Sequence, residues 1–158
     1  MYRMHRVFCA NDWELEEERI EFDRMLSGFN EQQAMPAGLL YVPVSLAQMR
    51  DKRPYQHTVD ENIRACRHYV LLPGEDWGPR ERALERDYRL ALKCAADPAL
   101  PMQGVAILLR ALPDSRPSPM AATLDAAGFP YCIFTTMEDY RTGITELLQQ
   151  WLTVDIEA

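Results

Sequence analysis

The segment from Pro73 to Pro79 places several chemically active side chains close together in the sequence. Asp76 is a carboxylate that can accept hydrogen bonds from ribose hydroxyls, and Trp77 offers a face on which a base or nicotinamide ring could stack. Glu85 follows in a stretch rich in helix-forming residues. A carboxylate there could stabilise the positive charge that develops on ribose when an N-glycosidic bond breaks. These side chains predict a site with Glu85 as the catalytic residue.

Other polar residues follow the apolar runs of the chain. Asn11 and Asp12 come directly after the first run, Ser45 after the second, Arg110 after the fourth and Thr135 after the fifth. In open parallel sheets, ligands bind beyond the carboxyl ends of the strands, so residues at these positions are candidates for binding. The predicted ligand-contacting residues are Asn11, Asp12, Ser45, Asp76 and Trp77.

Each of these residues also has a structural interpretation. Trp77 is the kind of residue that closes a loop by packing, and Asn11 is a good N-cap for a helix. Glu85 lies in a stretch, Arg80 to Arg89, where arginines alternate with acids, as on a solvated and ion-paired helix face. Both interpretations stay open at the level of sequence.

Several common catalytic and binding motifs are missing from the sequence. No GxGxxG follows the first apolar run, which argues against an ordinary dinucleotide-binding dehydrogenase. Neither the P-loop pattern GxxxxGK[ST] nor the hydrolase pattern GxSxG occurs. The four cysteines form no CxxC pair and stand at no metal-ligand spacing to a histidine, so no metal site is expected. Cys9 and Cys132 lie in apolar runs, which predicts that both are buried.

Apolar runs of strand length alternate with helical segments. Strands are expected at residues 5–9, 39–44, 69–72, 105–109 and 131–134. Helix starts are expected at the capping boxes of residues 11–14 and 58–61, at Ser118-Pro119, at residues 135–138, and over residues 81–95. The third and fourth runs are apolar without alternation, which is typical of strands covered on both faces. We therefore predict one α/β domain over residues 1–158, a three-layer flavodoxin-like or Rossmann-like sandwich with a mostly parallel five-stranded sheet.

Composition limits the partners of this chain. Its 158 residues suit one domain with a good core. Acidic residues outnumber basic ones by 24 to 17, and the net charge of -7 makes nucleic acid a poor partner. No apolar stretch approaches the length of about 20 residues that spans a bilayer. The N-terminus lacks the pattern of a signal peptide, so no membrane association and a cytoplasmic, reducing location are expected.

The chain resembles a bacterial family of uncharacterised domains related to TIR domains and, more distantly, to nucleoside deoxyribosyltransferases. Three segments carry the resemblance: Val7–Arg19, a strand followed by an acidic helix; Asn62–Leu72, before and within the third strand; and Glu85–Ala91. In enzymatic relatives, a glutamate at a similar helix start serves NAD or nucleoside N-glycosidic chemistry. The resemblance thus assigns that role to Glu85, with Asp87 and Glu81 as alternates.

Three hypotheses follow. The first is a TIR-like signalling or protein-interaction module, in bacterial defence or regulation, that forms homo-oligomers or binds a protein partner through the helices at residues 81–95 and 137–152. The second is an enzyme that cleaves the N-glycosidic bond of NAD or a nucleoside, which requires Glu85 to face the cleft. The third is a sensor that binds a nucleotide without turnover. The sequence slightly favours the first, because the catalytic signal is a single acid in a charged helix.

Overall fold

The computed structural model describes residues 1–44, 55–79 and 83–158. Its strands are all parallel and lie in the order β2-β1-β3-β4-β5. This arrangement confirms the predicted α/β fold with flavodoxin-like strand order. The bounds of the strands are β1 Arg3–Asn11, β2 Leu39–Val44, β3 His68–Leu72, β4 Gly104–Arg110 and β5 Cys132–Phe134.

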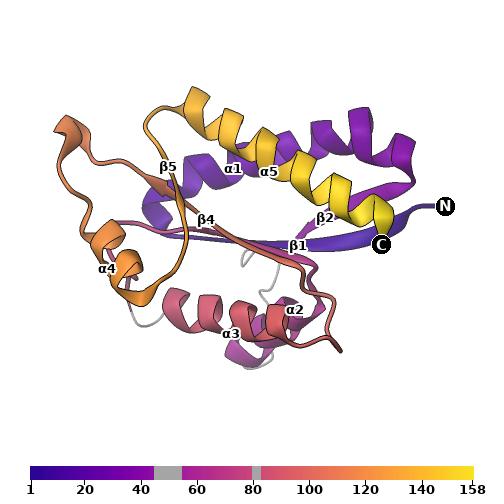
Figure 1. Ribbon diagram of the computed structural model, residues 1–158, viewed down its shortest axis with the longest axis horizontal. Coiled ribbons are helices and arrows are strands. Elements are labelled where there is room, and N and C mark those ends of the chain that lie inside the picture. Colours follow the sequence, from indigo (N-terminus) through magenta and orange to yellow (C-terminus); the bar gives the residue numbers. More distant parts are fainter. Residues whose placement is uncertain (45–54, 80–82) are drawn as a thin grey trace.

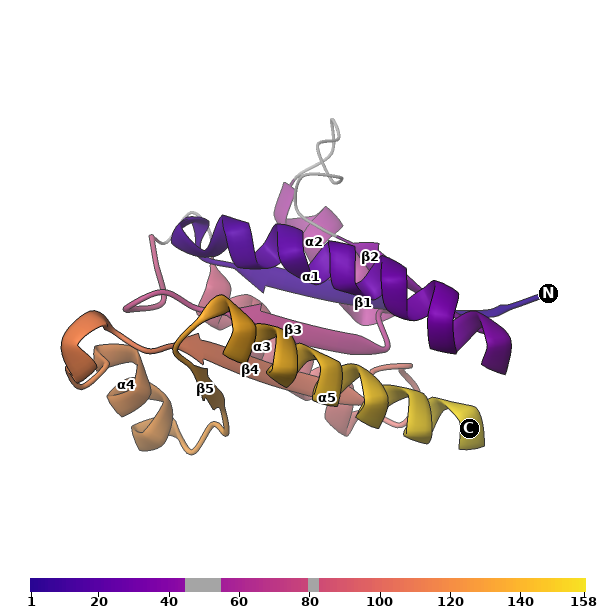
Figure 2. The ribbon, with the colours of Figure 1, turned by 90° about the horizontal axis from the view of Figure 1, so that it is seen from above.

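Helices cover both faces of the sheet (Figure 1). On one face α1 and α5 run side by side, as Figure 2 also shows, and α2 and α3 cover the other. The bounds are α1 Glu16–Phe29, α2 Tyr55–Ala65, α3 Leu84–Ala96, α4 Pro119–Ala127 and α5 Met137–Glu157. The short α4 lies near the carboxyl ends of the strands and packs into the layer of α2 and α3.

Two apolar layers form because successive side chains of a strand point to opposite faces. In β1, Val7 and Cys9 join the layer under α1 and α5, whereas Phe8 and Ala10 join the layer under α2 and α3. All five residues of β3 are buried. Double coverage therefore explains why the central strands read as unbroken apolar runs.

Some helix starts differ from the sequence prediction. Asn11 is the last residue of β1, and Asp12 instead caps the short 3₁₀ turn Trp13–Leu15, where its side chain accepts a hydrogen bond from the backbone of Glu14. The adjacent Asp12 competes for the same capping role. Thr58 lies inside α2, which already begins at Tyr55. The starts of α4 and α5 are confirmed, with Ser118 and Thr136 as N-caps.

The first helix continues beyond the end of α1. After Phe29 the chain passes through a π-helical turn (Asn30–Ala34) and a 3₁₀ turn (Met35–Ala37) that ends at Gly38 with φ of 80°. The expectation for one of the cysteines is wrong. Cys9 is buried as predicted, but Cys132 is exposed because it lies in the edge strand β5.

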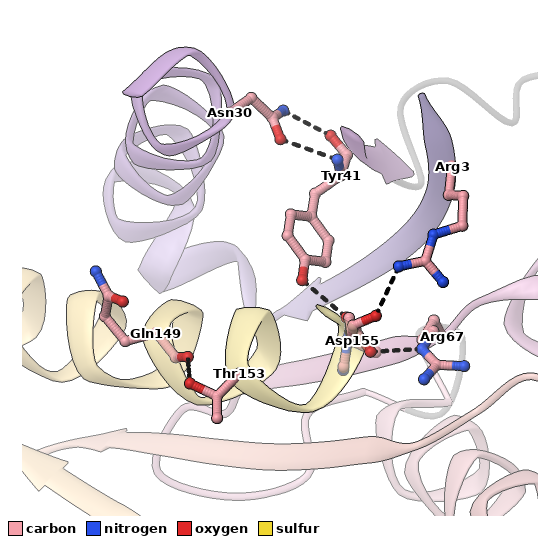
Figure 3. Close-up of polar contacts among 8 residues, drawn as sticks. Arg3, Asn30, Tyr41, Arg67, Gln149, Thr153 and Asp155 are labelled. Atoms are coloured by element: carbon pink, nitrogen blue, oxygen red, sulfur yellow. Dashed lines mark hydrogen bonds and ion pairs between the residues drawn. The ribbon is translucent and has the colours of Figure 1, made fainter. Parts of the chain in front are cut away.

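A buried polar cluster attaches the end of α5 to the amino edge of the sheet (Figure 3). Asp155 is fully buried. Its carboxylate accepts hydrogen bonds from the Tyr41 hydroxyl at 2.8 Å, from Arg67 Nε at 2.6 Å and from His68 Nε2 at 2.8 Å. The His68 ring also stacks on Trp151 with 4.2 Å between ring centres. These contacts tie strands far apart in sequence to one helix end.

Candidate functional site

A cleft of about 460 Å³ lies at the carboxyl edge of the sheet, where the sequence predicts a site. Its residues follow the ends of β1, β3, β4 and β5. They are Glu14, Leu15, Pro73, Gly74, Glu75, Arg110, Ala111, Leu112, Pro113, Arg116, Ser118 and Thr135. The loop after β3, Arg110 and Thr135 are thus brought together, as expected for the carboxyl ends of neighbouring parallel strands.

Asn11 and Asp12 do not line this cleft but lie behind the residues that do. Both are buried. Asn11 Nδ2 donates to the backbone carbonyl of Asp12 at 2.9 Å and to Glu16 Oε2 at 3.1 Å. The Asp12 backbone N–H donates to the carbonyl of Leu72 at 2.9 Å, which joins the end of β1 to the end of β3. Their hydrogen bonds shape the turn that presents Glu14 to the cleft.

The loop after β3 closes tightly over Asp12. A Cβ atom at Gly74 would lie 3.0 Å from Asp12 Cγ, so the absence of a side chain permits this approach. Gly78 has φ of 81° and lies against the same carboxylate. Asp76 is exposed and accepts a hydrogen bond from the backbone of Gly78 at 2.7 Å, as in an Asx turn. This loop therefore has a fixed shape, with Glu75 at the cleft.

Trp77 packs inward rather than toward the cleft. Its ring centre lies 6.1 Å from that of Tyr88, and it contacts the apolar layer under α2 and α3. The packing interpretation of Trp77 accounts for this position. A stacking role for Trp77 on a ligand stays a prediction.

Arg110 ends β4 at the floor of the cleft and meets a buried acid. Its Nη1 lies 3.4 Å from Glu18 Oε1, while Glu18 Oε2 is buried without a hydrogen bond to any residue in the described chain. Burial raises the pKa of Glu18, and the charge of Arg110 opposes that shift. The pair is therefore loosely made, and the Arg110 side chain stays partly exposed.

The loop after β4 supplies the opposite wall. It contains the 3₁₀ turn Pro113–Ser115, in which Asp114 has φ of 64°, a conformation that non-glycine residues seldom adopt. Arg116 is exposed at the cleft, and Ser118 accepts a hydrogen bond from the backbone of Ala121 at 3.2 Å. Arg116 stands in a proline-rich loop outside any motif, so no sequence signal marks it as a site residue.

Glu85 lies in a different place. It occupies the first turn of α3 and forms an ion pair with Arg89 at 3.0 Å. It lines a groove between α2 and α3 that shares no residue with the cleft; the groove comprises Asp60, Arg64, Glu85, Arg86, Arg89, Leu90 and Lys93. The alternate Asp87 is buried, 3.5 Å from Arg86. Ser45 and Glu81 lie outside the described residues.

A third feature is the partly uncovered edge of β4. β5 pairs only with Leu108–Arg110, whereas the residues from Gly104 to Ile107 pair with β3 on their other side. Two adjoining grooves follow this edge, one of about 520 Å³ and one of about 330 Å³, between β4, β5 and α5. Ile133 and Val154 are exposed beside it, by 57% and 51%.

Within the described ranges, no three His, Cys, Asp or Glu side chains are grouped so that they could hold a metal ion. None of the described helices combines the length and apolar character that crossing a membrane requires.

Comparison with known proteins gives a structural relative. No protein-family profile and no curated protein matches the sequence. Among solved structures, the fold is similar to a chain of the "RPS4 and RRS1 TIR domain heterodimer", with a TM-score of 0.53 and 16% identity. The match covers 93% of this chain and 97% of that chain. This chain has a TIR-like fold. Because the identity is low, this likeness shows the fold alone.

Proposed function

We propose that this TIR-like domain is a protein-interaction module that self-associates, and that the contact surface is the groove beside the uncovered edge of β4. The observation that carries this proposal is the shortness of β5, which leaves the outer edge of residues 104–107 unpaired by any described strand. An open strand edge readily pairs with another chain.

The side chains around the edge support the same surface. Ile133 of β5 and Val154 of α5 are large apolar residues exposed next to the grooves, and Leu147 and Trp151 of α5 line one of them. Apolar side chains gathered along one strand edge mark a contact site more often than isolated exposed residues do. The solved TIR domains that share this fold form a heterodimer, which supports pairing between domains of this type.

Sedimentation velocity on the purified chain, across a wide range of concentration, tests the proposal. We expect a reversible dimer or larger species, and Val154→Glu should weaken it by placing a charge in the apolar patch. Ile20→Glu is the matched control, because Ile20 is 56% exposed but lies on α1. A chain that stays monomeric throughout, or equal weakening by both substitutions, would contradict the proposal.

The enzyme hypothesis requires a catalytic carboxylate in the cleft, and Glu85 lies in the groove between α2 and α3. Catalysis by Glu85 stays a prediction that one assay addresses. Under the interaction proposal, concentrated protein releases no nicotinamide from NAD, and Glu85→Ala behaves like the unaltered chain. Release of nicotinamide by the unaltered chain but not by Glu85→Ala would establish the enzyme hypothesis.

A further inference from the structure

The cleft at the carboxyl edge contains two arginines whose N–H donors are largely unused by the described residues. Arg110 has one long contact, to Glu18 at 3.4 Å, although a guanidinium carries five N–H donors. Arg116 forms no ion pair with any residue in the described ranges. Both side chains line the same cleft, on either side of the turn Pro113–Ser115. Two guanidinium groups that line one cleft supply planar donors of the kind that bind a phosphate group.

Glu18 lies behind Arg110. It lies in the first turn of α1 with a side chain only 5% exposed, and its backbone carbonyl accepts a hydrogen bond from the buried Tyr140 hydroxyl at 2.7 Å. The charge of this buried acid attracts the guanidinium of Arg110, while the long separation of 3.4 Å leaves the other N–H donors of Arg110 unused by the described residues. Glu18 is thus a positioning residue for an anion in front of Arg110.

The remaining polar side chains of the cleft are acceptors. Glu14 and Glu75 are exposed carboxylates that line it, and they balance the charge of the two arginines. A simple anion would use the arginines alone, whereas hydroxyl groups would donate hydrogen bonds to both carboxylates. The combination selects a ligand with a phosphate at one end and hydroxyl groups at the other.

We propose that this cleft binds a small phosphorylated ligand with vicinal hydroxyl groups, whose phosphate contacts Arg110 and Arg116 and whose hydroxyls contact Glu14 and Glu75. The volume of about 460 Å³ lies within the range of about 300–1,000 Å³ typical of small-molecule sites. The site is independent of the proposed self-association surface, because none of its lining residues lines the grooves beside β4.

Isothermal titration of the full chain with ribose 5-phosphate, inorganic phosphate and ribose tests the proposal. We expect saturable binding of ribose 5-phosphate, weaker binding of inorganic phosphate and none of ribose. Arg110→Gln and Arg116→Gln should each lower the affinity for ribose 5-phosphate about tenfold or more, since each removes a charge-assisted contact. Glu75→Gln should lower the affinity for ribose 5-phosphate without lowering that for inorganic phosphate, because only the hydroxyl groups contact Glu75.

Arg86→Gln is the control, because Arg86 is an exposed arginine paired with Asp60 in the other groove. It should bind ribose 5-phosphate like the unaltered chain, and circular dichroism checks that every variant is folded. Absence of saturable binding, equal affinity for ribose 5-phosphate and inorganic phosphate, or an equal loss in Arg86→Gln would each overturn the proposal.

Discussion

At the amino edge of the sheet, the carboxylate of Asp155 is buried and accepts hydrogen bonds from Tyr41, Arg67 and His68. At the carboxyl edge, Glu18 is buried to a similar degree, yet its side chain has one long contact to Arg110 and one oxygen without a partner. Burying an ionised group is costly unless hydrogen bonds and opposite charges compensate it. The amino edge meets that requirement with residues of the chain itself. The carboxyl edge leaves hydrogen-bonding groups that a ligand can use.

The contrast separates structural from functional use of the same side-chain types. At the amino edge, the paired carboxylate of Asp155 holds the end of α5 to the strands. Donors that the fold leaves incompletely used are available to another molecule, and they lie at the carboxyl edge, where parallel α/β sheets bind ligands. The following substitutions test whether the two edges differ in this way.

The largest effect is expected for Asp155→Ala. It leaves Arg67 and the Tyr41 hydroxyl without their buried partner, which typically costs about 3–5 kcal/mol of unfolding free energy. Urea unfolding followed by circular dichroism measures this loss. Asp125→Ala is the control, because Asp125 is exposed and only receives a hydrogen bond from Tyr131, so its loss should stay below about 0.5 kcal/mol. Similar losses in both variants would contradict a special role for the amino edge.

Acid is expected to lower the unfolding free energy by less than Asp155→Ala does, because protonation removes the charge of Asp155 but leaves its side chain in place. Burial lowers the pKa of His68 from its ordinary 6.5 and outweighs the opposing effect of Asp155, and burial likewise lowers that of His5. Burial alone would raise the pKa of Asp155, but hydrogen bonds from His68, Arg67 and Tyr41 hold it below its ordinary 3.8.

For all three groups the unfolded chain binds more protons than the folded chain in acid, so stability rises with pH. Unfolding free energy should therefore be full above pH 6.5, decline as the histidines of the unfolded chain protonate, and decline further below pH 3.8. Urea midpoints measured over this span check the profile. A midpoint that does not change with pH would argue against the depressed pKa values.

Gly104→Ala should cause an intermediate loss of unfolding free energy. A Cβ at Gly104 would lie 2.9 Å from His68 Nδ1, and that ring is held between Trp151 and Asp155, so the neighbour cannot move. Overpacking of this kind costs about 1–3 kcal/mol. At the other edge, a Cβ at Gly74 would lie 3.0 Å from Asp12 Cγ. Gly74→Ala should cost less unfolding free energy, because Asp12 lies among loop residues and not between aromatic rings and strands. Thermal unfolding ranks the two variants, and a larger loss for Gly74→Ala would reverse the comparison.

The smallest effect is expected for Glu18→Gln. Burial raises the pKa of Glu18, so at neutral pH its ionised form opposes folding, and the isosteric amide removes that charge. Stability should stay unchanged or rise by up to about 1 kcal/mol in urea unfolding. A loss as large as that of Asp155→Ala would show that the Glu18–Arg110 pair is as structural as the amino-edge cluster.

Much of the fold could be predicted from sequence, because its signals are local. Unbroken apolar runs marked the central strands, and Ser118 and Thr136 marked helix starts. The signals failed where neighbours compete for one role. Asp12 takes the cap expected at Asn11, and the edge position of β5 exposes Cys132.

The site was harder to predict. The rule about strand ends placed the loop after β3, Arg110 and Thr135 at the cleft. It could not tell which loop residues turn inward, and Trp77 packs on Tyr88 while Glu75 faces the opening. Arg116 reaches the cleft from the long connection after β4. The sequence does not distinguish the buried Glu18 from the other acids of α1.

The two ends of the chain meet at the amino edge, where Arg3 donates to the terminal carbonyl of Ala158 at 2.7 Å (Figure 1). Neighbouring ends of this kind make a domain suitable for insertion into a surface loop of a host protein. Spliced in through this pair of ends, the domain would keep its carboxyl edge directed away from the host. Binding in the cleft could then be read out by a fused fluorescent protein without obstruction of the opening.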